Sequence, residues 1–148
     1  AFAIGVIMSS SSIATALMAS RLSLLVRRFP EPVLILAAFL LYALALVMVP
    51  WVPNLWLFLV PTTIFGIAQG MNTPSIQSLL ARLAPPQHRG AFMSLNGMVL
   101  RLGQTLGPLV MGAAYAAWGI GGVYRLGAVL ALLTAGILSY TLGTRHQP

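Results

Sequence analysis

One charged side chain lies in the middle of a long apolar stretch, where it needs a specific partner. Arg101 belongs to VLRLGQTLGPLVMG (99–112) and follows Arg89 by twelve positions, or roughly 18 Å along a helix. If hydrocarbon surrounds this stretch, a charge at that depth costs at least about 3 kcal/mol. We expect Arg101 to face a hydrated path for a solute or for protons. Two structural alternatives stay open: Arg101 reaches the membrane surface, or it pairs with a carboxylate outside this chain.

A stripe of small and polar side chains follows one face of residues 55–80. Its members lie within about 80° of one another, since each helical residue turns by about 100°. They are Thr62, Gly66, Gln69, Thr73 and Gln77, with Asn72 beside them. Hydrogen bonds between helices explain such a stripe as well as a lined cavity does. The candidate residues for a substrate pathway are Gln69, Asn72, Thr73, Arg101 and Gln104.

Catalytic and metal-binding groups are missing from the apolar stretches. Glu31 is the only acid in the chain, it lies in a predicted loop, and there is no cysteine. His88 and His146 lie in polar flanking segments, so no serine in an apolar stretch has a histidine base at its own depth. The chain also lacks a glycine-rich phosphate-binding motif. We therefore expect no enzyme, no metal site and no cofactor.

The composition indicates that a membrane surrounds most of these residues. Hydrophobic residues make up 59% of the 148 positions and charged residues only 6%, whereas globular domains carry about a quarter charged residues. A soluble domain would need a polar coat that this chain cannot supply. The net charge of +7 is spread over arginines between apolar runs, so nucleic acid is not an expected partner. The expected partner is the lipid bilayer.

Five apolar runs are each near the length that a helix needs to cross roughly 30 Å of hydrocarbon. They span approximately 3–24, 33–50, 55–80, 91–116 and 123–142. Backbone groups in lipid must be hydrogen-bonded within the segment, and the alternation typical of a membrane β-barrel is absent. The predicted fold class is an all-α, polytopic membrane protein with a helical bundle.

The distribution of arginines predicts the orientation of the chain. The loops after the first and third runs hold Arg21, Arg27, Arg28, Arg82 and Arg89. The two other loops hold Arg125 alone. Because positively charged loops stay in the cytoplasm, we expect these two loops and the C-terminus to be cytoplasmic, with Arg27, Arg28 and Arg89 as basic loop residues. The tryptophans lie at the opposite ends, as in an aromatic belt.

The runs differ in polarity. Residues 33–50 and 123–142 carry few polar groups and are expected to face lipid. Close helix packing, with a polar lining as the alternative, is predicted for the small-residue face formed by Ser9, Ser12, Ala16 and Ala19.

The fourth run has two different faces. Gly103 and Gly107 favour tight packing against another helix, and Pro108 favours a bend. Ser94, Arg101 and Thr105 lie nearly opposite that glycine face and give the run a polar side.

Three segments together resemble the C-terminal half of a major facilitator superfamily transporter, its helices eight to twelve of twelve. SLLVRRFPEPVL (23–34) is placed like the basic family loop GxLADRxGRRxxL. Residues 65–97 are similar to the tenth helix, the next cytoplasmic loop and the start of the eleventh helix. LGQTLGPLVMG (102–112) is similar to the family's helix with glycine and proline. The resemblance covers essentially all of the chain and implies that 1–148 form a half-bundle within a twelve-helix fold.

Departures from the family pattern favour the C-terminal half over the N-terminal half. Ser23 and Pro30 replace glycines of the loop motif, and Arg27 stands where the N-terminal copy would have aspartate. Only Gly112 follows the Gly107-Pro108 pair, which weakens the likeness to drug/proton antiporters. Since the chain starts without Met and shows five spans, we also expect a further helix before Ala1.

The resemblance implies secondary active transport of a small solute by alternating access, and it favours proton-coupled efflux. The lysine-free sequence, rich in alanine, leucine and arginine, indicates a bacterial inner membrane. The implied partners are the N-terminal half of the same transporter, a small-molecule substrate and H⁺. Any proton-carrying group would lie outside this chain, because Glu31 is predicted in a loop. The alternatives are an uptake carrier of the same fold and a non-transporting assembly or receptor subunit.

Overall fold

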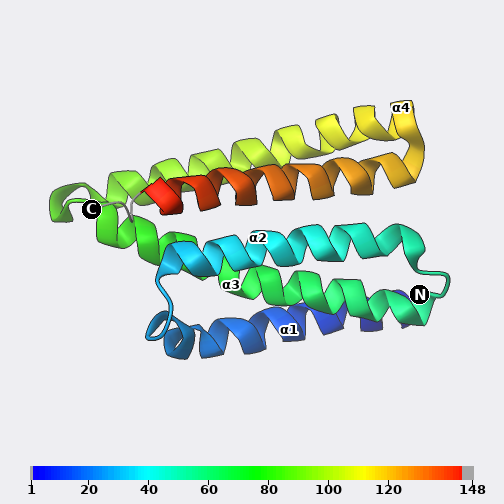
Figure 1. Cartoon of the computed structure of the whole chain (residues 1–148), viewed down its shortest axis with the longest axis horizontal. Helices are drawn as coiled ribbons and strands as arrows, with labels where there is room; N and C mark the ends of the chain where they lie inside the picture. The colour runs from blue at the N-terminus through cyan, green and yellow to red at the C-terminus, as the bar shows by residue number, and fades with distance from the viewer. Residues whose placement is uncertain (1, 145–148) are drawn as a thin grey trace.

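The computed structural model describes residues 2–144. Long helices lie side by side along the long axis of the molecule, and consecutive helices run in opposite directions (Figure 1). Their bounds are Phe2–Val26 for α1, Glu31–Met48 for α2, Leu59–Leu83 for α3 and Arg89–Thr144 for α4. Short 3-10 helices lie in the connections: η1 (Val49–Trp51), η2 (Leu55–Phe58) and η3 (Pro86–His88). The part of the chain that is described contains no strand, and the predicted all-α bundle is confirmed.

Prolines and one glycine set the helix ends. Pro30 is extended, with φ −65° and ψ 146°, directly before α2. Ala84 is extended after α3, as expected for a residue that precedes proline. Gly119 has φ 68°, a conformation that glycine adopts without a steric penalty. It divides α4 into a first segment (89–118) and a second segment (120–144), which folds back along the first (Figure 1).

The helices cover all five apolar runs, with α4 covering the last two. Two predicted loop positions differ. Glu31, expected in a loop, is the first residue of α2, because Pro32 fits the first turn of a helix. The break expected between the runs 91–116 and 123–142 reduces to Gly119, and the three residues after it are helical. One residue with positive φ is enough to reverse the chain there.

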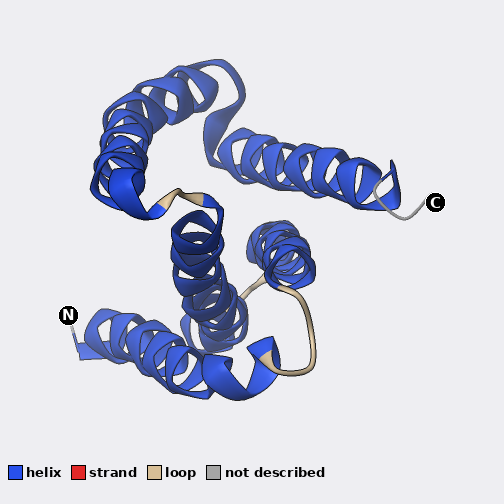
Figure 2. Ribbon diagram, turned by 90° about the vertical axis from the view of Figure 1, so that its left-hand side faces the viewer, coloured by secondary structure: helices blue, strands red, loops and turns tan. Residues whose placement is uncertain are grey.

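α3 lies at the centre of the first three helices. It packs against α1 on one side and α2 on the other, and α2 also packs against α4 (Figure 2). The buried cluster joining α1, α2 and α3 consists of Leu22, Leu34, Ala38, Ala68 and Met71. On the second segment of α4, Ala128, Ala131 and Ala135 are buried at helical spacing. Such small residues let helices approach closely where lipid removes the usual hydrophobic driving force.

The contact between α1 and α3 depends on two glycines. A Cβ atom on Gly66 would overlap the carbonyl oxygen of Ser11, and one on Gly70 would lie 2.5 Å from that of Thr15. The Thr15 hydroxyl donates a hydrogen bond of 2.9 Å to the Gly66 carbonyl oxygen. These two glycines, four residues apart, let the two backbones touch.

The packing face of α1 differs from the predicted one. The expected small-residue face of Ser9, Ser12, Ala16 and Ala19 is exposed among the described residues. The face that packs against α3 contains Ser11, Ala14, Thr15 and Met18 instead. Both faces of α1 carry small side chains with hydroxyl groups among them, so residue type alone does not distinguish them.

Candidate substrate-pathway surface

The predicted polar stripe on α3 is divided by the structure. Gly66 is buried against α1, whereas Gln69, Thr73 and Gln77 are exposed. The Thr62 hydroxyl donates to the Phe58 carbonyl oxygen of the preceding turn at 2.8 Å. The side of α3 left uncovered by α1 and α2 therefore carries two amides and a hydroxyl.

Asn72 lies apart from this exposed side. Its side chain interacts with that of Tyr42 on α2, and its Oδ1 atom is buried without a hydrogen-bond partner in the described part of the chain. The ring of Tyr42 also lies 4.8 Å, between centroids, from that of Phe65. Asn72 thus belongs to the contact between α2 and α3, although its spacing in the sequence grouped it with Gln69 and Thr73.

Arg101 and Gln104 are exposed on the first segment of α4. Within residues 2–144, Arg101 forms no ion pair, and the Thr105 hydroxyl donates a hydrogen bond of 3.0 Å to its carbonyl oxygen. Among the described residues, no side-chain hydrogen bond or ion pair joins Arg101 to Gln69 or Thr73 on α3. The candidate pathway residues therefore occupy exposed positions on two helices, except for Asn72.

The first segment of α4 has little cover along its whole length. Ala114 is its only buried residue between positions 89 and 118. Cβ atoms built on Gly103 and Gly107 would meet no atom within 4 Å among the described residues, and Pro108 is exposed. Among the described residues, nothing covers this glycine face.

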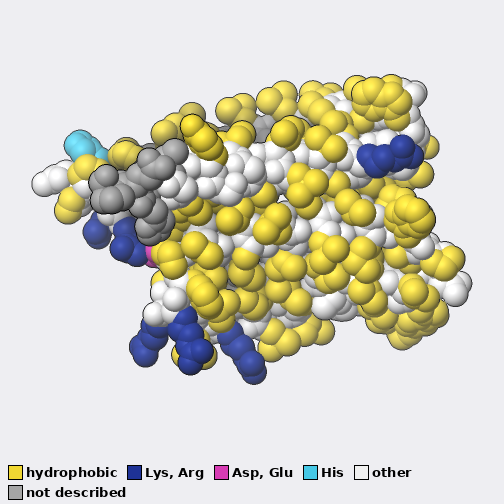
Figure 3. Space-filling model, viewed as in Figure 1, with side chains coloured by type: hydrophobic (Ala, Val, Ile, Leu, Met, Phe, Trp, Pro, Cys, Tyr) yellow, Lys and Arg dark blue, Asp and Glu magenta, His cyan; other side chains and the backbone are white. Residues whose placement is uncertain are grey.

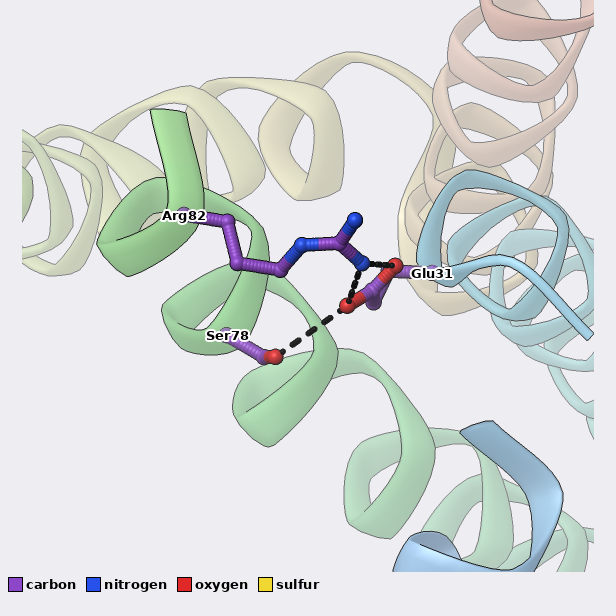
Figure 4. A network of polar contacts seen from close by, with 3 residues as sticks. All are labelled: Glu31, Ser78 and Arg82. Carbon is purple, nitrogen blue, oxygen red and sulfur yellow. Dashed lines mark hydrogen bonds and ion pairs between the residues drawn. The ribbon is translucent and has the colours of Figure 1, made fainter. Parts of the chain in front are cut away.

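An ion pair that the sequence did not predict joins α2 to α3 (Figure 4). One guanidinium nitrogen of Arg82 donates to both carboxylate oxygens of Glu31, at 2.7 and 2.8 Å. The Ser78 hydroxyl donates to the same carboxylate at 3.3 Å. The Glu31 side chain is 4% exposed and that of Arg82 is 69% exposed, so the pair stands at the edge of the bundle. Both residues follow apolar runs that end on the same predicted side, a signal that places them at one end of the bundle without selecting Arg82 among the arginines there.

Arginines gather at one end of the molecule (Figure 3). Arg27 and Arg28 are exposed in the turn after α1, and Arg89 is exposed at the start of α4. Arg125 lies at the other end, near the point where α4 turns back. Among residues 2–144 there is no cluster of three or more acidic, histidine or cysteine side chains that would hold a metal. Arg145 and His146 lie outside the described residues.

Comparison with known proteins defines the class of this bundle. The model of the Major Facilitator Superfamily matches residues 1–148, and the chain belongs to that superfamily. Among residues 2–144, four helices are long and apolar enough to cross a membrane, the last being the two-segment α4. The chain thus has the helices of a multi-pass membrane protein and belongs to a superfamily of transporters.

The curated relatives are bacterial proteins named Multidrug resistance protein MdtG. That of Citrobacter koseri is 30% identical over 135 residues, covering 91% of this chain and 33% of its own length. That of Enterobacter lignolyticus is 33% identical over 140 residues, covering 91% and 32%. That of Escherichia fergusonii is 28% identical over 148 residues, covering 100% and 36%. This chain therefore spans about a third of the length of these relatives. No solved structure matches it.

Proposed function

We propose that this chain is the C-terminal half-bundle of a secondary carrier that exports small organic solutes from a bacterium by alternating access, coupled to protons. The relatives named as multidrug resistance proteins support export of several substrates. Membership of the superfamily supports transport in general. The N-terminal half of the same transporter would supply the remaining helices.

The observation that carries the proposal is the position of Arg101. Its side chain is exposed on an apolar helix and has no carboxylate partner among residues 2–144. A charge in the hydrocarbon region persists where a hydrated cavity or an opposite charge compensates it. Glu31, the only acid of the chain, pairs with Arg82 instead. Arg101 would therefore bind an anionic group of a substrate or pair with a carboxylate of the other half.

Gln69, Thr73 and Gln104 would add neutral hydrogen-bonding groups to the same pathway. Carriers of this kind place the substrate near the midplane, between two halves that rock against each other. Gly103, Gly107 and Pro108 would shape the moving helix, because glycines allow close sliding contacts and proline bends the backbone. Asn72 is left out of the lining because it packs against α2.

The test is transport by the full-length protein with Arg101→Gln. In cells that lack other efflux pumps, we expect the variant to lose resistance to most of a panel of unrelated antibiotics, with membrane insertion unchanged. Arg101→Lys tests whether the charge alone is sufficient, since lysine keeps the positive charge but lacks the planar guanidinium group. Arg21→Gln is the matched control, because Arg21 is exposed at the end of α1 and takes no part in the proposed pathway.

Counterflow of labelled solutes in proteoliposomes distinguishes the alternatives. Solute exchange that is driven by a proton gradient and directed outward supports the proposal. Inward accumulation would favour an uptake carrier, and the absence of any exchange would favour an assembly or receptor subunit. Wild-type rates in the Arg101→Gln protein would remove this arginine from the mechanism.

A further inference from the structure

A groove lies between α2 and the second segment of α4, at the end of the bundle away from the arginine-rich end. Its volume is about 670 Å³, within the roughly 300–1,000 Å³ range of ligand sites. On the α2 side it is lined by Leu46, Val47, Pro50 and Trp51, and on the α4 side by Arg125, Ala128, Val129 and Leu132. Arg125 is the only charged residue in this lining.

A second groove meets the first at the same arginine. It has a volume of about 430 Å³ and is lined by Trp118, Gly122, Arg125, Leu126 and Val129. Arg125 and Val129 line both grooves, so the arginine side chain lies where the two apolar grooves adjoin.

The guanidinium group is directed toward the turn of α4. A Cβ atom built on Gly121 would lie 3.5 Å from Nη2 of Arg125, so the side chain reaches back by one helical turn. Trp51 and Trp118, which are 84% and 69% exposed, lie in the same two linings. Tryptophans of this kind settle at the level of the lipid headgroups. The charge is thus at headgroup depth and the apolar part of the groove extends below it.

Arg125 has no carboxylate to pair with in residues 2–144. The single acid, Glu31, is at the other end of the bundle and is held by Arg82 and Ser78. An arginine at the membrane surface with no protein counter-ion attracts a phosphate group. Its planar guanidinium group binds the phosphate through two parallel hydrogen bonds. A guanidinium group beside an apolar groove offers a charge for the headgroup phosphate of an anionic lipid and an apolar surface for its acyl chains.

We propose that this groove binds one anionic phospholipid, with its phosphate on Arg125 and an acyl chain along Leu46, Val129 and Leu132. The proposal does not depend on transport. A lipid fits this groove because the lining below the charge is apolar and because the bilayer surrounds these two helices. A segment of the same protein outside residues 2–144, or a free anion, would be the competing occupant.

The experiment uses the full-length protein, purified in detergent and depleted of lipid. Binding of phosphatidylglycerol and of phosphatidylcholine with the same acyl chains is measured by native mass spectrometry and by the midpoint of thermal unfolding. We expect phosphatidylglycerol to bind Arg125→Gln about tenfold more weakly than wild type, the loss of one charge-assisted contact. Arg125→Lys should keep much of the binding, and the exposed control Arg21→Gln should keep all of it.

Two further arms separate the competing occupants. Val129→Trp would fill the groove without changing its charge and should also weaken lipid binding. Inorganic phosphate alone should give little stabilisation of the wild-type protein. Equal binding by wild type and Arg125→Gln, or full stabilisation by phosphate alone, would overturn the proposal. The proposal would also be overturned if a thiol reagent could not reach a cysteine at position 125, since a protein segment would then cover the groove.

Discussion

At the scale of single residues, two charged groups have opposite surroundings. Glu31 is almost fully buried but receives hydrogen bonds from Arg82 and Ser78. Arg101 is exposed and receives no such compensation among residues 2–144. A buried carboxylate is tolerated when its oxygens are satisfied, whereas an unpaired charge in an apolar span calls for a partner from elsewhere. The first residue therefore serves the structure of this bundle, and the second is the one that we propose for transport.

The pair of Glu31 and Arg82 predicts unequal single mutants. Arg82→Gln leaves a buried carboxylate without its guanidinium donor and should lower the free energy of unfolding by about 1–3 kcal/mol. Glu31→Gln should cost less, because the Arg82 side chain is 69% exposed and water solvates it. The double mutant should resemble Glu31→Gln. Unfolding in mixed micelles, analysed as a double-mutant cycle, measures the coupling.

Strictly additive effects in that cycle would show that the ion pair contributes nothing beyond the separate side chains. Arg21→Gln is the control, since it removes an exposed arginine with no recorded partner. The sequence placed Glu31 and five arginines on the same side of the bundle. It could not select Arg82 among them, because the choice depends on the register of α3 against α2.

At the scale of helices, the existence of each element was predictable and the packing faces were not. Long apolar runs bounded by proline and glycine predicted helices, because lipid leaves the backbone no other way to satisfy its hydrogen bonds. The packing face of α1 contains Ser11 and Thr15 rather than Ser9 and Ser12. In water, polar residues mark the outer face of a helix, but both faces of α1 combine small, hydroxyl and apolar side chains, so this contrast is lost. Asn72 packs against α2, although Gln69 and Thr73 on the same predicted stripe are exposed.

The glycines of α3 predict a sharp response to added methyl groups. Gly66→Ala and Gly70→Ala would each push a Cβ atom into a backbone carbonyl oxygen of α1. Overpacking of this kind costs about 1–3 kcal/mol, so both variants should unfold at lower temperature in detergent. Each of the two variants should also weaken disulfide cross-linking between one cysteine introduced in α1 and one introduced in α3.

Gly5→Ala is the matched control for these two variants. Gly5 is also helical, but its Cβ atom would meet nothing within 4 Å in the described structure. Alanine stabilises a helix over glycine by about 1 kcal/mol, so this variant should be neutral or slightly more stable. A Gly66→Ala protein as stable as Gly5→Ala would mean that α1 and α3 are further apart than the structure places them.

At the scale of the whole molecule, the composition predicted a membrane protein. The structure adds which faces of the helices are left uncovered. Apolar side chains cover much of the visible surface, as expected for helices in lipid (Figure 3). The first segment of α4 combines an uncovered glycine face with an uncovered arginine. The sequence of 148 residues does not predict what lies beside these groups, because this chain spans about a third of the length of its relatives.

The asymmetry of arginines across the bundle predicts its orientation in the membrane. Arg27, Arg28 and Arg89 lie with Arg82 at one end, whereas Arg125 is the arginine near the turn of α4. Positively charged loops remain in the cytoplasm, so the ends of α1 and α3 should be cytoplasmic. Single cysteines at positions 28 and 89 should then be protected in intact cells from a membrane-impermeant thiol reagent. A cysteine in the exposed connection at Asn54 should react. The reverse labelling pattern would place the arginine-rich end outside, and equal labelling at both ends would show that charge does not set the orientation.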